Sequence, residues 1–173
     1  MRAIIITTLL LSVLLLWSCA PQYNWRQTAL AGTPLQTLFP CKPERAQRKM
    51  QLGGQWVDLE MASCAVSGVS VAVGHAVLAD PSSAGAVLLQ WRQATLATMR
   101  ATEVRQSPYR MPQAIDLADS VSVRANGTGP DAQSLALQAV WFASGKSAFV
   151  AMLYGPTIQS EVAETFFAAL RLP

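Results

Sequence analysis

The side chains best suited to acid–base chemistry lie in two neighbouring stretches of the sequence. His75 is the only histidine, so catalysis by a Ser–His or Cys–His pair would have to use it. Asp58 and Glu60 are two positions apart, which in a strand places both carboxylates on one face at a spacing of about 7 Å. Paired carboxylates can perform acid–base hydrolysis of glycosides. These three residues define one alternative for the function, a hydrolase.

A structural interpretation of the same residues is the one we adopt. His75 is in phase with Val71, Val73 and Val77, and a single histidine on an apolar strand face is typically a packed, hydrogen-bonded core residue. Neighbouring acids on a solvent-facing strand typically serve solvation. A zinc site needs more ligands than one histidine and the available cysteines provide. We therefore predict no catalytic residue, no metal site and no cofactor.

The N-terminus has the composition of an export signal. Arg2 is followed by an almost wholly apolar run, Ala3–Trp17, of 15 residues, which is shorter than the roughly 20 residues that span a bilayer as a helix. A basic start, a short apolar segment and a small residue before the cleavage site are typical of a secretory signal. The alternative is an uncleaved membrane anchor. We predict that residues 1–18 are a signal peptide.

The end of this segment resembles the lipobox of bacterial lipoproteins. Leu16-Trp17-Ser18-Cys19 has an aliphatic residue three positions before a cysteine, and the resemblance implies that Cys19 is acylated and anchors the chain to a membrane through its lipid. Ala20, rather than aspartate, follows the cysteine. By resemblance to enterobacterial sorting this favours the outer membrane, on its periplasmic face. The enzymatic alternative would then be a periplasmic hydrolase.

Length and charge limit the number of domains and the kinds of partner of the exported part. Removal of the signal leaves 155 of the 173 residues, which is the size of one domain. We expect residues 19–34 to be a lipidated tether and residues 35–173 to be a single domain. The net charge of +3 comes from bases and acids spread along the chain, without the clustered basic residues of a nucleic-acid binder. Nucleic acid is therefore excluded as a partner.

The two remaining cysteines, Cys41 and Cys64, are predicted to form a disulfide. An even number of cysteines in an oxidising compartment favours pairing, although two buried free thiols remain an alternative. A two-residue turn at Gly53-Gly54 sets Leu52 opposite Gln55 and, counted outward, Pro43 opposite Cys64. Cys41 then lies within a residue or two of Cys64 across the strand pair.

Hydrophobic periodicity predicts an antiparallel sheet with two helices. The expected strands cover residues 35–39, 45–52, 55–64, 69–77, 120–124, 134–142 and 148–154, and the expected helices cover about 80–101 and 158–170. Asp80-Pro81 can cap the first helix. The small residues on one face of strand 69–77 would let a helix pack closely. The predicted fold is α+β, with about six to seven strands and the chain order ββββαβββα.

A long connection is expected between the first helix and the next strand. Residues 103–118 contain Pro108 and Pro112 and show no clean period, and connections of this length often carry a function. Its Tyr109, Arg110 and Met111 are the residue types that contact partners. The alternative is a loop that covers one end of the sheet.

The order of elements, with Phe39-Pro40-x-x-Pro43 before a glycine hairpin, is similar to that of small uncharacterised proteobacterial lipoproteins. It resembles more distantly the PsbP-like α/β/α sandwich. The resemblance covers about residues 35–172 and implies a sheet between helices in a protein that assists assembly rather than catalysis. We therefore expect a lipid-anchored, non-catalytic binding or assembly module with a protein partner in the envelope. A carrier of a small apolar ligand is a further alternative, and it would need a sizeable apolar cavity between sheet and helix.

Overall fold

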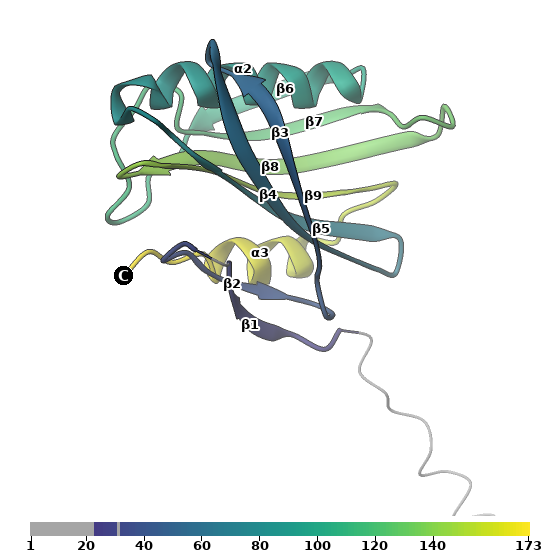
Figure 1. The fold of residues 1–173 in the computed structure, drawn as a ribbon. Coiled ribbons are helices and arrows are strands. Elements are labelled where there is room, and N and C mark those ends of the chain that lie inside the picture. The colour runs from purple at the N-terminus through teal and green to yellow at the C-terminus, as the bar shows by residue number, and fades with distance from the viewer. Residues whose placement is uncertain (1–22, 31) are drawn as a thin grey trace, which may run out of the picture.

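An antiparallel sheet of seven strands is the centre of the structure, a computed structural model that describes residues 23–30 and 32–173 (Figure 1). From edge to edge its strands are β3 (Glu44–Leu52), β4 (Gln55–Val66), β5 (Val69–Val77), β9 (Ser147–Gly155), β8 (Ser134–Ser144), β7 (Val121–Thr128) and β6 (Thr102–Pro108). A separate two-stranded sheet pairs β1 (Arg26–Ala29) with β2 (Gln36–Phe39). The helices are η2 (Pro81–Ser83, a 3-10 turn), α2 (Ala84–Thr98) and α3 (Ser160–Ala168). The predicted α+β class, with its antiparallel sheet and two α-helices, is confirmed.

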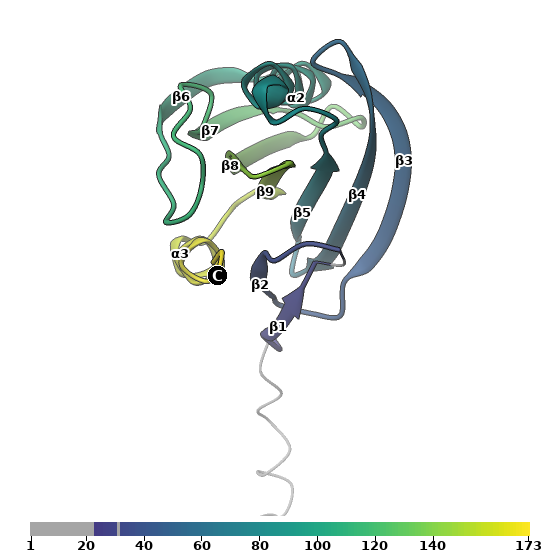
Figure 2. The same cartoon turned by 60° about the vertical axis from the view of Figure 1, so that its left-hand side comes forward.

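The sheet separates two cores. Trp141 and Phe142 are consecutive residues of β8, and each is fully buried on a different side of the sheet, because successive side chains of a strand point to opposite faces. The Trp141 side packs against α2, and the Phe142 side packs against α3 and the β1–β2 sheet. Figure 2 shows the sheet bent, with α2 on one side of it and α3 with β1 and β2 on the other.

The β3–β4 hairpin has the predicted register. Gly53 and Gly54 form its turn with φ values of +60° and +77°, which glycine adopts without a steric cost. Leu52 lies opposite Gln55 and Arg45 lies opposite Ala62, as the two-residue turn predicts. The register sets which side chains of this edge of the sheet face α2.

The predicted cap at Asp80-Pro81 opens the 3-10 turn η2, and α2 follows directly at Ala84. The Asp80 side chain accepts a hydrogen bond from the backbone N–H of Ser82 at 2.9 Å, and hydrogen bonds from Ser82 lower the pKa of Asp80. The helix packs closely on β5, as predicted from its small-residue face. A Cβ atom at Gly74 would lie 2.7 Å from Cζ2 of Trp91, so glycine is needed at that contact.

The predicted start of the folded domain at residue 35 is wrong, because the described part of the predicted tether is folded. Residues 26–29 form β1, which pairs with β2, and Leu30 is buried in the α3-side core. Trp25 packs against the same core. The side chains of β1 are mostly polar and exposed, so the segment has no apolar period to reveal it.

The predicted 103–118 connection is also partly wrong, because its first residues continue a strand. β6 spans Thr102–Pro108 and pairs with β7 at the edge of the sheet, with a register shift between Thr102 and Arg105. All seven of its residues are exposed. An edge strand that packs against nothing on either face shows no alternation in its sequence. The real connection is therefore residues 109–120.

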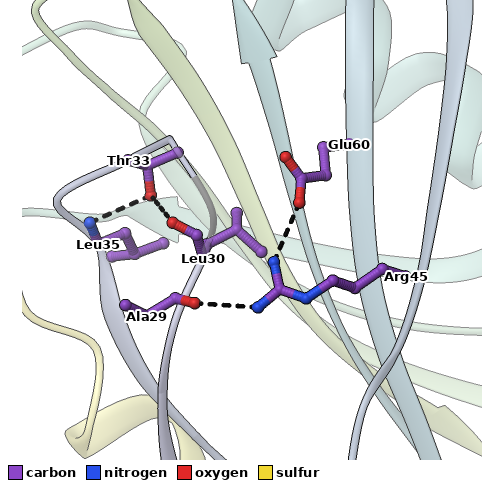
Figure 3. A network of polar contacts seen from close by, with 6 residues as sticks. All are labelled: Ala29, Leu30, Thr33, Leu35, Arg45 and Glu60. Carbon is purple, nitrogen blue, oxygen red and sulfur yellow. Dashed lines mark hydrogen bonds and ion pairs between the residues drawn. The ribbon is translucent and has the colours of Figure 1, made fainter.

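Two contacts fix the N-terminal hairpin to the main sheet. Figure 3 shows the first, in which the Arg45 guanidinium donates to Glu60 at 3.1 Å and to the carbonyl oxygen of Ala29 at 3.2 Å. The second is the Cys41–Cys64 disulfide, with a Cα–Cα distance of 5.9 Å. The predicted pairing of these cysteines is confirmed, and it joins the segment after β2 to β4, the strand next to the edge strand β3.

In the described ranges, no helix has both the length and the apolar character that crossing a bilayer requires.

Candidate functional site

A large hollow lies between α2 and the sheet. This α2 cleft has a volume of about 580 Å³, within the range of about 300–1,000 Å³ that is usual for small-molecule sites. It is lined by Ala46, Gln47, Arg48, Met50, Leu59, Met61, Ser63, Ala72, Trp91, Ala94, Thr95, Thr98, Met99, Thr128, Gly129, Pro130, Leu135, Leu137, Met152 and Tyr154. These residues come from β3, β4, β5, β7, β8, β9 and α2, and from the segments that follow α2 and β7.

Small side chains at facing positions create this space. Ala46 of β3, Ser63 of β4 and Ala72 of β5 lie on the same sheet face, and Ala94 faces them from α2. Ala46 and Ala94 are exposed at the opening, whereas Ala72 is buried at the floor. Longer side chains at these positions would close the gap between helix and sheet.

The wall of the cleft is apolar and adaptable. Among the described residues, four methionines line it: Met50, Met61, Met99 and Met152. Methionine is unbranched and polarizable, so a surface built from it can repack around ligands of different shape. Thr95 and Thr98 add little polarity, because their hydroxyl groups donate to the carbonyl oxygens of Trp91 and Ala94 within the helix. Such a wall suits a hydrocarbon ligand.

One charged side chain, Arg48, lines the cleft. It lies on the edge strand β3 opposite Leu59, whose side chain is buried in the α2-side core, so both residues project toward α2. Arg48 is exposed. In the part of the chain that the structure describes, no acidic residue lines the cleft and no carboxylate forms an ion pair with Arg48.

The three residues of the hydrolase alternative meet in a second hollow on the opposite face of the sheet. This polar groove has a volume of about 540 Å³ and is lined by Gly32, Gln47, Arg48, Lys49, Asp58, Leu59, Glu60, His75 and Val77. His75 is only 4% exposed. Its Nε2 lies 3.1 Å from Oγ of Ser147, and its ring stacks on Phe149 with a centroid distance of 5.1 Å.

The contacts of His75 are those of a packed residue. Burial lowers the pKa of His75, and the nearby Glu60 carboxylate opposes that effect. Glu60 is itself bound by Arg45, and Asp58 lies 4.0 Å from Lys49 at the surface. A Ser–His pair acts as a nucleophile when a third group orients the histidine. Among the described residues, no carboxylate forms a hydrogen bond with the His75 ring, so the groove lacks that group.

The three residues expected to contact a partner have different environments. Met111 is 9% exposed and belongs to the α3-side core. Tyr109 packs on Phe142 with a ring-centroid distance of 5.8 Å, and burial raises the pKa of its hydroxyl to about 12. Arg110 is exposed and forms an ion pair with Asp116. Tyr109 and Met111 therefore anchor the loop to the core, which fits the alternative of a loop covering the sheet, and only Arg110 is displayed to solvent.

The remaining sequence predictions concern the anchor and metals. Cys19, the predicted lipid site, lies outside the described residues. Within those residues, no group of three or more His, Cys, Asp or Glu side chains is placed to hold a metal ion.

Sequence reasoning named an apolar cavity between sheet and helix as the requirement for a carrier, but it did not identify the residues of the α2 cleft. The one available sequence signal for the cleft was the occurrence of alanines and methionines at positions that share one face of the hairpin strands, such as Ala46 and Met50. Comparison with known proteins adds no relative to this picture. No family model matches the chain, and no similar protein is found among the curated ones.

Proposed function

We propose that this chain is a lipid-anchored protein of the bacterial outer membrane, facing the periplasm, that binds an apolar ligand without catalysing a reaction. The observation that carries the proposal is the α2 cleft, with its volume of about 580 Å³ and its methionine-rich wall. The anchor rests on the sequence around Cys19. A protein partner in the envelope that supplies or accepts the ligand is part of the same proposal.

The composition of the cleft favours binding over catalysis. None of its lining residues among those described is a histidine, cysteine, aspartate or glutamate, so the wall offers no general base or activated nucleophile. The histidine lies on the other face of the sheet, buried and in contact with Ser147 and Phe149. Ser63 and Tyr154 line the wall without a histidine or carboxylate among the described lining residues to activate their hydroxyl groups, so the site is suited to carrying a ligand unchanged.

The experiment fills the cleft from its exposed side. Ala94→Trp places a large ring at the opening from an exposed helix position, so the fold should be retained. Ala86→Trp is the matched control, because Ala86 is also exposed on α2 but does not line the cleft. Binding is followed by the fluorescence increase of the neutral apolar probe N-phenylnaphthylamine, and circular dichroism verifies folding of each variant.

The wild type and Ala86→Trp should bind the probe equally well. Ala94→Trp should weaken binding by about tenfold or more, which corresponds to about 1.4 kcal/mol of lost contact. A folded wild-type protein that leaves the probe fluorescence unchanged would contradict the proposal. So would equal binding by the two tryptophan variants.

A further inference from the structure

We infer that the ligand is an anionic amphiphile, with a single apolar chain in the α2 cleft and a negatively charged head group on Arg48. The inference rests on the proposed function and specifies its ligand class. It starts from the charge distribution along the wall, where Arg48 is the one charged side chain among the described lining residues. An uncharged hydrocarbon would make no use of that guanidinium.

The position of Arg48 suits a head group at the opening of the cleft. β3 is the edge strand of the sheet, so its side chains border both the cleft and the solvent. Arg48 projects on the α2 side, in line with Ala46 and Met50. A ligand chain lying among the methionines would therefore end beside the guanidinium, where its head group stays in contact with water.

The neighbouring cations of β3 already have partners, which distinguishes Arg48 from them. Arg45 binds Glu60 and Lys49 lies 4.0 Å from Asp58, both on the face opposite the cleft. Arg48 also borders the polar groove, but in that groove the two carboxylates are paired with these other cations. Arg48 lies beside an apolar wall and forms an ion pair with none of the carboxylates that the structure describes.

The chemistry of arginine defines the head group. A guanidinium presents a planar set of N–H donors that matches a carboxylate or phosphate in a two-point hydrogen bond. Partial removal from water beside an apolar wall strengthens such a pair. A cationic head group at the same place would be repelled. A fatty acid is the simplest molecule with the required combination of one chain and one anion.

The experiment compares three ligands with the same chain and different head groups. Myristate, myristyl alcohol and myristylamine each displace N-phenylnaphthylamine from the full-length mature protein, at concentrations below those at which they form micelles. For the wild type, myristate should bind about tenfold more tightly than the alcohol, and the amine should bind more weakly than either.

Variants of two neighbouring residues, Arg48 and Lys49, isolate the role of the guanidinium. Arg48→Gln should remove the preference for myristate over the alcohol while leaving binding of the alcohol unchanged, and Arg48→Lys should restore part of the preference. Lys49→Gln is the matched control, because Lys49 is adjacent on the same exposed strand but projects to the other face. It should keep the wild-type preference.

The outcomes separate this inference from the proposed function. If acid and alcohol displace the probe equally from the wild type, or if Arg48→Gln keeps the preference, the anionic head group is wrong while the apolar cleft stands. Loss of the preference in Lys49→Gln would also overturn the assignment to Arg48. If none of the three ligands displaces a bound probe, the single-chain amphiphile is wrong, whereas the proposed function fails only if the probe itself does not bind or is insensitive to Ala94→Trp.

Discussion

Removal of the Cys41–Cys64 disulfide should cause a large loss of stability with little change in fold. The bond joins the segment after β2 to β4, with the two Cα atoms 5.9 Å apart. Two perturbations test it, reduction of the wild type and the double substitution Cys41→Ala and Cys64→Ala. Cys64 is 6% exposed, so the substitution also removes some packing, whereas reduction removes only the covalent link.

The expected magnitude follows from the length of the closed loop. The cysteines are 23 positions apart, and for a loop of about 24 residues the chain-entropy relation gives a stabilisation of about 3.4 kcal/mol at 25 °C. For a domain of about 150 residues, each kcal/mol shifts the melting temperature by about 2–4 °C. Reduction should therefore lower the melting temperature by about 7–14 °C.

Thermal unfolding followed by circular dichroism, with and without reductant, measures this shift. The double variant should melt at or slightly below the temperature of the reduced wild type, and reductant should leave its melting unchanged. Thiol titration of the unfolded, unreduced mature protein provides the independent check. Two reactive thiols in that titration, or a wild-type melting temperature that is unchanged by reductant, would refute the stabilising role of the disulfide.

The other predictions concern the anchor and the buried histidine. Cys19→Ser should leave an unprocessed precursor without fatty-acid label, because serine lacks the thiol that would carry the lipid; labelled, processed protein in that variant would show the assignment to be wrong. The pKa of His75 is lowered by burial, so the unfolded chain, with a histidine pKa of about 6.5, binds the proton more tightly than the folded protein. The stability that depends on neutral His75 is thus fully present above about pH 6.5 and is lost as the pH falls below that value. His75→Gln should therefore flatten the pH dependence of the melting temperature in that acidic range. An unchanged slope of melting temperature against pH would contradict this.

Local sequence signals predicted the parts of the fold that depend on neighbouring residues. Gly53-Gly54 set the register of β3 and β4, because a two-residue turn leaves one way of pairing the strands. The alternation in β5 and the Asp80-Pro81 cap located this strand and the helical segment, η2 and α2, that follows it. In each case the physical cause lies within a few positions of the residue it controls.

Features that depend on distant residues were not predictable in this way. Arg92 is 8% exposed on α2 and lies 3.3 Å from Asp119, which comes from a loop 27 positions later. Helical periodicity gives no sign of that partner. The α2 cleft has the same character, since its wall is assembled from strands and a helix spread over most of the domain. β1 and β6 escaped prediction because strands with exposed side chains carry no burial pattern.

The two faces of the sheet would give a protein anchored at Cys19 a direction. β1 lies on the face that carries α3, and the α2 cleft lies on the other face (Figures 1 and 2). If Cys19 carries the lipid, only the chain from Cys19 to Tyr23 joins it to the described domain, and four residues reach at most about 14 Å. A domain of this size has a radius of gyration of about 15 Å, so a connection this short holds the β1 side of the domain close to the lipid. The cleft would then face away from the leaflet that holds the anchor, and cargo would arrive from the aqueous space or from the opposing membrane.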